Sequence, residues 1–244
     1  EILRIDSEGV TSFSIPSPQR SSCIFEYIYF SRPDSILDGS RVYPTRLQMG
    51  AELAREHPVE ADLVTAVPDS AISAGIGYSQ FSGIPFSETL IKNRYVGRTF
   101  IQPDQKLREV GVQLKFNPLP EILDGQRVIL VDDSIVRGTT TSHVVRLLRR
   151  AGAKEIHLRV CAPPIRFPCH FGIDMPTQWE LVAANQEVDQ ICKSLGADSL
   201  GYLSLNGLKS AVKGQDKGFC DACFTGNYPV PVQLEMGKMI LEGG

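Results

Sequence analysis

Residues 128–140 read Val-Ile-Leu-Val-Asp-Asp-Ser-Ile-Val-Arg-Gly-Thr-Thr, and this stretch decides the fold. Its four aliphatic residues predict a buried strand that runs directly into Asp132 and Asp133. After a short loop, residues 139–151 have the apolar spacing of a helix that ends at Gly152. A second apolar run at 156–161 completes a strand, a helix and a strand. We therefore expect an α/β fold with a parallel sheet flanked by helices.

The junction between the first strand and the helix predicts a phosphate site. Backbone amides of residues 135–140 have no helical partners, so they can point at an anion, and Gly138 lets the backbone approach it closely. Hydroxyl donors come from Ser134, Thr139, Thr140 and Thr141. The two carboxylates would repel a phosphate unless they hold sugar hydroxyls or a cation. A phosphorylated ribose with magnesium meets both conditions.

Other phosphate motifs do not fit this chain. It has no Gly-Lys-Ser/Thr of a P-loop, and the pair Gly75 and Gly77 lacks the third glycine of a dinucleotide fingerprint. The remaining alternative is that Asp132 and Asp133 only cap the helix that follows. That alternative explains either acid alone but not the whole thirteen-residue string.

The rest of the chain contains further periodic segments. Residues 92–109 are polar, rich in Arg and Lys, and contain Gly97 and Pro103, which is typical of a long functional lid or a disordered loop. Asp124-Gly125 predicts a turn. The other expected elements are a β-hairpin at 2–15, strands at 24–30 and 62–67, and helices at 44–56, 71–81 and 187–194.

Bulk properties favour a globular protein with a full core. The 244 residues are 42% hydrophobic and 22% charged, and the net charge of −3 implies no general attraction to nucleic acid or to an anionic membrane. No run of 18 apolar residues predicts a membrane span, and the amino terminus lacks the layout of a signal peptide. We expect a cytoplasmic protein, and the missing initiator Met indicates a processed product or a fragment.

The string at 128–140 resembles the motif by which type I phosphoribosyltransferases bind 5-phosphoribosyl 1-pyrophosphate (PRPP). The wider chain resembles the amidophosphoribosyltransferases of that family. The segments that carry this wider resemblance are 26–35 (Glu-Tyr-Ile-Tyr-Phe-Ser-Arg-Pro-Asp-Ser), 67–70 (Val-Pro-Asp-Ser), 92–102 (Lys-Asn-Arg-Tyr-Val-Gly-Arg-Thr-Phe-Ile-Gln), 165–168 (Ile-Arg-Phe-Pro) and 171–176 (Phe-Gly-Ile-Asp-Met-Pro).

The resemblance implies a type I phosphoribosyltransferase fold with a small hood, and three parts of the chain. Residues 1–20 would be a hairpin remnant of an N-terminal glutaminase domain. Residues 21–225 would form the phosphoribosyltransferase domain, and residues 226–244 would be a C-terminal tail.

The resemblance also implies roles for individual residues. Asp132 and Asp133 would contact the ribose hydroxyls directly or through Mg²⁺, and Ser70 would complete the metal and diphosphate contacts. Lys92 and Arg94 would act as catalytic residues that neutralise the leaving diphosphate. The implied substrate-binding residues are Asp69, Ser70, Arg98, Lys115, Ser134, Ile135, Val136, Arg137, Gly138, Thr139 and Thr140. Taken alone, residues 67–70 would be an ordinary turn and the basic residues a solvated surface.

The implied reaction is displacement of pyrophosphate from C1 of PRPP by ammonia, which gives 5-phosphoribosylamine, the first step of de novo purine synthesis. Family members carry a glutaminase domain that begins with a nucleophilic Cys, whereas this sequence begins with Glu1 and has no Cys before Cys23. We expect the chain to use ammonia only, with a glutaminase domain or chain as a partner and a homotetramer as the assembly. The alternatives are a base-specific phosphoribosyltransferase and a non-catalytic PRPP sensor.

Six cysteines in a chain without a secretion signal favour thiols or metal ligands over disulfides. The resemblance implies a [4Fe-4S] cluster on Cys23, Cys169, Cys220 and Cys223, and four thiolates suit such a cluster. Structural zinc and metal-free thiols are the alternatives. The other two, at positions 161 and 192, are expected to be packing residues.

Overall fold

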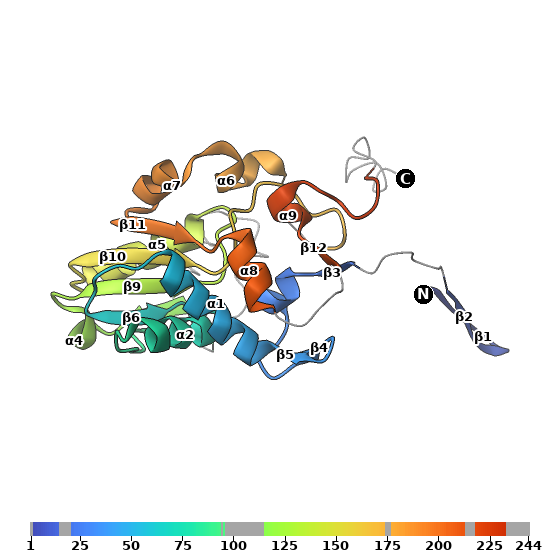
Figure 1. The fold of residues 1–244 in the computed structure, drawn as a ribbon, viewed down its shortest axis with the longest axis horizontal. Coiled ribbons are helices and arrows are strands. Elements are labelled where there is room, and N and C mark those ends of the chain that lie inside the picture. Colours follow the sequence, from blue (N-terminus) through green and yellow to red (C-terminus); the bar gives the residue numbers. More distant parts are fainter. Residues whose placement is uncertain are drawn as a thin grey trace.

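The computed structural model describes residues 2–14, 21–93, 95, 115–173, 177–212 and 218–232. Its centre is a four-stranded sheet in the order β11-β10-β9-β6, with every neighbouring pair parallel (Figure 1). In the register, Val128 lies beside Leu63 on one side and Ile156 on the other. The strands are β6 (Leu63–Ala66), β9 (Arg127–Asp132), β10 (Glu155–Val160) and β11 (Ser199–Tyr202).

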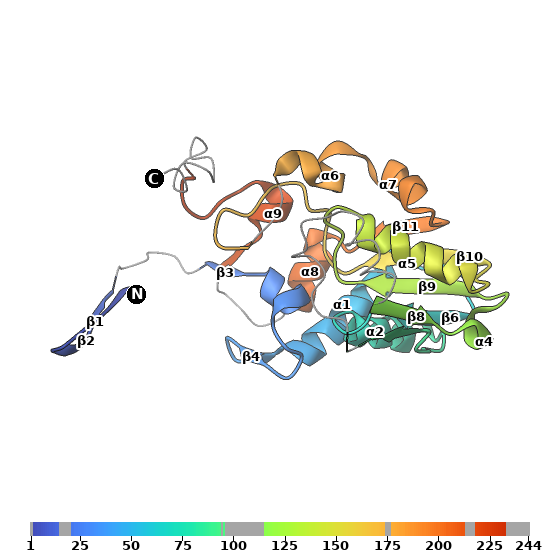
Figure 2. The ribbon, with the colours of Figure 1, turned by 180° about the vertical axis from the view of Figure 1, so that it is seen from behind.

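Helices cover both faces of this sheet, as the two opposite views show (Figures 1 and 2). Ile129 and Val131 of β9 pack into the core beneath the first group of helices, whereas Val128 and Leu130 pack into the core beneath the second. All four side chains are fully buried, which explains why this strand is an uninterrupted apolar run. The first group is α1 (Val42–Glu56), α2 (Ile72–Ser82) and α8 (Leu205–Ala211); the second is α5 (Thr139–Arg150) and α7 (Val188–Leu195).

Glycines allow α1 and α2 to pack at close range. A Cβ atom on Gly77 would lie 2.0 Å from the carbonyl oxygen of Leu47, and one on Gly50 would lie 1.9 Å from that of Ala74. Both distances are far below van der Waals contact, so any side chain at either position would push the helices apart. The helix predicted at 71–81 is present as α2. Its Gly77 allows the close packing of α2 against α1.

The predicted strand at 24–30 is wrong. The chain forms only a short strand, β3 (Ser21–Cys23), and then a π-helical turn, η1 (Glu26–Phe30), in which the Ser31 amide donates to the Glu26 carbonyl at 3.1 Å. The buried side chains are Ile24, Phe25, Tyr27 and Ile28. Their spacing matches one face of a helix, and the β-branched and aromatic composition hid that pattern.

Segments remote in sequence meet beside the main sheet. Strand β3 pairs in parallel with β12 (Gly218–Cys220), and β7 (Leu90–Lys92) pairs antiparallel with β8 (Phe116–Pro118).

The predicted hairpin is present as β1 (Ile2–Asp6) and β2 (Gly9–Phe13), and every residue of both strands is exposed. The remaining short elements are β4 (Ile36–Leu37), β5 (Ser40–Arg41), α4 (Pro120–Leu123), η3 (Gln178–Glu180), α6 (Val182–Asn185) and α9 (Ala222–Thr225).

Most of the predicted lid at 92–109 lies outside the described residues; Lys92, Asn93 and Tyr95 are described. The other predicted helices and strands of the α/β core are present within one to three residues of the expected bounds. Within the described residues, no helix has both the length and the apolar composition needed to cross a membrane.

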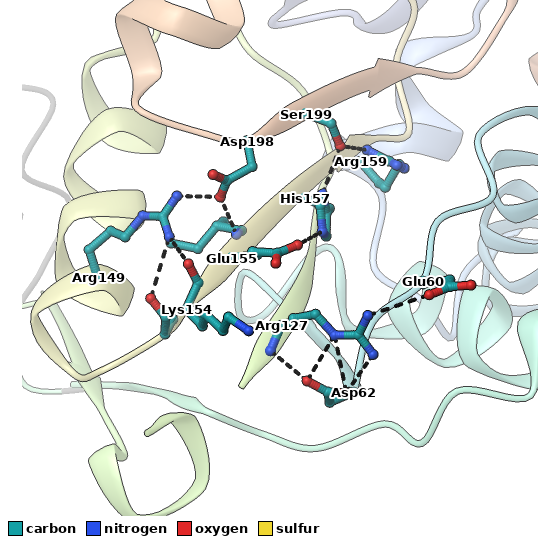
Figure 3. A network of polar contacts seen from close by, with 12 residues as sticks. Glu60, Asp62, Arg127, Arg149, Lys154, Glu155, His157, Arg159, Asp198 and Ser199 are labelled. Carbon is teal, nitrogen blue, oxygen red and sulfur yellow. Dashed lines mark hydrogen bonds and ion pairs between the residues drawn. The ribbon is translucent and has the colours of Figure 1, made fainter. Parts of the chain in front are cut away.

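Ion pairs join the strands at the amino-terminal edge of the sheet (Figure 3). The Arg127 guanidinium, at the start of β9, donates to Asp62, which precedes β6, at 2.9 Å. Arg149 at the end of α5 pairs with Asp198, which immediately precedes β11. These contacts brace the edge that lies opposite the two acids of the motif.

Candidate active site

The loops that follow β6 and β9 meet at the carboxyl edge of the sheet. The two strands are neighbours, and the Val67 amide continues their pairing by donating to the Val131 carbonyl at 2.9 Å. Just beyond this point, the Ser70 hydroxyl donates to Oδ2 of Asp133 at 2.5 Å. The structure thus brings together two segments that the sequence places 63 residues apart.

Both acids of the motif are buried and held by hydrogen bonds. Asp132 is 6% exposed, and it accepts from the Asp133 amide at 2.9 Å and from the Thr141 hydroxyl at 3.3 Å. Asp133 is 8% exposed and accepts from Ser70 and, at 2.5 Å, from the Ser134 hydroxyl. Their carboxylates are therefore fixed in orientation before any ligand arrives.

Burial raises the pKa of both carboxyl groups. The charge of Asp133 raises the pKa of Asp132 further, whereas hydrogen bonds from the Asp133 amide and Thr141 lower it. For Asp133, the hydroxyls of Ser134 and Ser70 and the charge of Arg46 act against burial. Two adjacent buried acids of this kind favour a bound cation that would offset their repulsion.

The oxygen donors of Ser70, Asp132 and Asp133 suit Mg²⁺, which prefers oxygen ligands. Within the described residues, no cluster of three or more His, Cys, Asp or Glu side chains has the spacing of a metal site. Two carboxylates and a hydroxyl fit the habit of Mg²⁺, which keeps waters and takes further ligands from substrate phosphates.

Helix α5 begins directly after the acids with unpartnered amides. Gly138 precedes it in the left-handed conformation, with φ of 78°, which favours glycine. In the described residues, no side chain caps this end, and the helical bonding starts when the Ser142 amide donates to the Gly138 carbonyl at 2.9 Å. The amides of Thr139, Thr140 and Thr141 therefore precede the helical bonding and are available to an anion.

Three residues of the predicted phosphate loop make contacts elsewhere in the protein. Ile135 is 1% exposed and belongs to the core beneath α5, so it can offer only its backbone. Val136 accepts a hydrogen bond at its carbonyl from the Val182 amide. The Arg137 guanidinium pairs with Glu180 at 3.2 Å, which directs it toward η3.

Two predicted lysines lie near the acid pair, at the ends of β7 and β8. The Asn93 amide, just after Lys92, donates to the Lys115 carbonyl at 2.8 Å, so the two lysines are neighbours. Lys92 forms an ion pair with Asp69, with Nζ 2.5 Å from Oδ2. Arg94 and Arg98 lie outside the described residues.

Comparison with known proteins agrees with this geometry. A family model described as a phosphoribosyl transferase domain matches residues 80–165. The amidophosphoribosyltransferase of Archaeoglobus fulgidus is 59% identical over 221 residues, which is 90% of this chain and 48% of that protein. The amidophosphoribosyltransferase of Synechocystis sp. is 50% identical over 245 residues, which is 99% of this chain and 50% of that protein.

Over 90–99% of its length, this chain is similar to about half of each of these amidophosphoribosyltransferases. A solved structure described as the allosteric regulatory enzyme of purine biosynthesis matches it with a TM-score of 0.83 at 50% identity, over 96% of this chain and 52% of that one. The glutamine PRPP amidotransferase of B. subtilis, complexed with ADP and GMP, matches with a TM-score of 0.81 at 49% identity, over 96% of this chain and 53% of that one. The chain spans about half the length of these relatives.

Two residues near the site were not expected from the sequence. Arg46 of α1 is 2% exposed, donates to the Tyr27 and Ser31 carbonyls at 2.8 Å, and lowers the pKa of Asp133. Tyr202 lies in the same register row as Asp132, two strands away, and the charge of Asp132 adds to burial in raising its phenol pKa. Neither lies in a motif, so the sequence carried no signal for them.

The four cysteines of the predicted cluster come together beside the main sheet. Cys23 lies opposite Cys220 in the pairing of β3 with β12. Burial raises the pKa of Cys223, and the neighbouring thiols of Cys23, Cys220 and Cys169 raise it further. Within the described residues, the four thiols do not have metal-site spacing. Four thiols are chemically suitable metal donors, but the sulfur positions in this structure would have to adjust to hold a metal centre.

The remaining two cysteines lie apart from this group. Cys161 is buried at the end of β10, where its amide donates to the Asp132 carbonyl at 3.0 Å. The Cys192 thiol donates to the Ala197 carbonyl at 3.3 Å, at the end of α7. Cys161 is buried and Cys192 is partly buried, which fits the expected role of both as packing residues.

Proposed function

We propose that this chain transfers the phosphoribosyl group of PRPP to ammonia, giving 5-phosphoribosylamine and pyrophosphate, the first step of de novo purine synthesis. The observation that carries the proposal is the acid pair Asp132 and Asp133, which is tied to Ser70 and precedes the start of α5, where no side chain among the described residues caps the helix. The names of the relatives support the same reaction. We assign residues 21–225 to the transferase domain.

Each part of PRPP has a complementary group in this arrangement. The 5-phosphate would bind the amides and hydroxyls of residues 134–140, as an anion does at a helix start. Asp132 and Asp133 would accept from the ribose 2- and 3-hydroxyls and, with Ser70, would hold Mg²⁺. The bound ion would supply positive charge that stabilises the leaving diphosphate.

The protein's own contribution to the chemistry is orientation and charge. As the bond from C1 to pyrophosphate lengthens, the ribose gains positive charge and the diphosphate gains negative charge. We assign Lys92 and Lys115 the role of stabilising the diphosphate, which their interactions with Asp69 support, and we assign Arg94 and Arg98 the same role. Orientation of ammonia opposite the leaving group would supply the rest.

The decisive experiment measures pyrophosphate release from PRPP and Mg²⁺ with ammonium chloride, and separately with adenine, guanine, hypoxanthine or orotate. Release with ammonium alone is expected. Release with a base would indicate a base-specific phosphoribosyltransferase, and PRPP binding without any release would indicate a sensor. A well-folded protein that gives no calorimetric signal with PRPP and Mg²⁺ would overturn the proposal.

We infer that the ammonia comes from a glutaminase domain or chain and that the working protein is a homotetramer. The B. subtilis relative is described as a glutamine PRPP amidotransferase, which supports the first inference. Light scattering of the whole protein, together with glutamine-dependent activity, tests both. A monomer without glutamine-dependent turnover would refute them.

We also propose that Cys23, Cys169, Cys220 and Cys223 hold a [4Fe-4S] cluster. The support is the gathering of four thiols from three remote segments, since four thiolates are the usual ligands of such a cluster. Protein purified without oxygen should be brown, with broad absorption near about 400 nm. Cys223→Ser should lose iron, whereas Cys192→Ser should keep it. A colourless protein with one zinc would show the assignment to be wrong.

A further inference from the structure

An ion pair spans the predicted diphosphate subsite. Asp69 lies in the loop after β6, immediately before Ser70, and its carboxylate is 2.5 Å from the ammonium of Lys92 at the end of β7. The Asp69 side chain is 66% exposed and that of Lys92 is 31% exposed. The pair therefore links the loop after β6 to the β7–β8 ribbon and remains open to solvent.

The charges around this pair are unevenly shielded. Lys115 is half-buried and adjoins Lys92; burial and the charge of Lys92 lower its pKa, while Asp69, Asp133 and Asp132 raise it. Asp132 and Asp133 are buried and already accept hydrogen bonds from fixed donors. Of these three acids, Asp69 is the exposed one, so a negatively charged ligand can take the place of its carboxylate beside Lys92.

An ionised carboxylate has only acceptor oxygens, so Asp69 offers no hydrogen to a diphosphate and repels its charge. Asp69 instead forms an ion pair with Lys92, one of the cations that would bind a diphosphate. Exposed ion pairs are weak, so a multiply charged diphosphate can displace the carboxylate from the lysine. Asp69 thus differs in kind from Ser70, its neighbour in the loop.

We propose that Asp69 is a built-in competitor that holds Lys92 in the ligand-free protein and is displaced when the diphosphate of PRPP arrives. The inference rests on the proposed function, because it assumes that a diphosphate binds here. Asp69 keeps the lysine in place within the empty subsite, weakens binding of the diphosphate, and speeds release of pyrophosphate after transfer. It is a positioning residue that acts through Lys92.

The test compares binding of inorganic pyrophosphate and of PRPP, each with Mg²⁺, to the wild type and to Asp69→Asn by calorimetry. The variant should bind pyrophosphate about three- to tenfold more tightly, the size expected for removing one nearby negative charge in a solvated site. Pyrophosphate dissociation, followed by stopped flow, should slow in proportion. Weaker or equal binding would overturn the inference, because it would mean that Asp69 assists the ligand or does nothing.

A second pair of variants asks whether the effect passes through Lys92. Lys92→Met should weaken pyrophosphate binding, and adding Asp69→Asn in that background should recover less than half of the gain that it gives alone. An equal gain in both backgrounds would show a general charge effect and would refute the role of Lys92.

The matched control is Asp62→Asn at the opposite edge of the sheet, where Asp62 pairs with Arg127 (Figure 3). It removes the same charge from a comparable ion pair, and pyrophosphate affinity should not change; a matching gain there would contradict a local effect of Asp69. Failure of the proposed function has a different signature, because wild-type protein would then bind neither PRPP nor pyrophosphate.

Discussion

The hydroxyl of Ser70 donates a 2.5 Å hydrogen bond to the carboxylate of Asp133, across the boundary between two neighbouring strands. Ser70 follows β6 and Asp133 follows β9, so this bond exists only when these strands are paired. It joins the loop assigned to the diphosphate with the acids assigned to the ribose.

Ser70→Ala should lower ammonium-dependent turnover of PRPP by about 10- to 100-fold, because a hydrogen bond to a charged group contributes about 1.5–3 kcal/mol. Steady-state pyrophosphate release measures the change. Ser142→Ala is the control, since the Ser142 hydroxyl accepts from the exposed Arg146 of α5, away from the two acids. Equal turnover in both variants would contradict the role of Ser70.

Asp133→Ala should abolish transfer while the protein stays folded. The site loses the side chain proposed to bind the ribose and the metal, but it also loses one of two adjacent buried acids whose pKa values are raised by burial. The melting temperature in metal-free buffer should therefore equal or exceed that of the wild type. Wild-type turnover by this variant would show that the motif assignment is wrong.

Tyr202→Phe should leave stability unchanged or raise it by up to about 1–3 kcal/mol, the cost of a buried hydroxyl without a partner. The Tyr202 hydroxyl is buried, and within the described residues it has no hydrogen-bond partner. Urea unfolding measures the difference. Tyr78→Phe is the control and should be destabilised, because its buried hydroxyl donates to the His57 carbonyl at 2.9 Å. Destabilisation of the Tyr202 variant by more than about 1 kcal/mol would indicate an ordered water on the phenol.

Asp62→Asn should lower the melting temperature at neutral pH and lose this effect in acid. The side chain and amide of Arg127 lower the Asp62 pKa from 3.8 to about 2. Because the folded pKa is depressed, the stabilisation is present above pH 3.8 and disappears as the pH falls through about 2. Calorimetry should show the gap between wild type and variant closing over that window. A difference in melting temperature that stays constant from pH 7 down to about pH 2 would count against the ion pair.

Local patterns were enough to predict the centre of the molecule. The apolar run of β9, the acids at its end and the helical spacing of α5 are all properties of adjacent residues, so they appear without any knowledge of the partners. Local patterns failed where composition and spacing disagreed. Residues 24–30 have strand-like composition, yet their buried positions follow a helical face.

Side-chain partners required the tertiary structure. The turn of Arg137 toward Glu180, the burial of Arg46 near Asp133, and the ion pair between Asp69 and Lys92 all join segments remote in sequence. The residues at 128–140 do not by themselves predict that the loop after β6 will lie beside them.

The amino-acid sequence by itself determined an α/β fold and predicted a phosphate site at the end of one strand, because hydrophobic periodicity and unpaired amides are local consequences of residue type. The tertiary structure decided which loops complete that site. The order β11-β10-β9-β6 places Ser70 on Asp133, and the pairing of β7 with β8 brings Lys92 beside Lys115. These contacts depend on long-range strand pairing, which local sequence patterns do not encode.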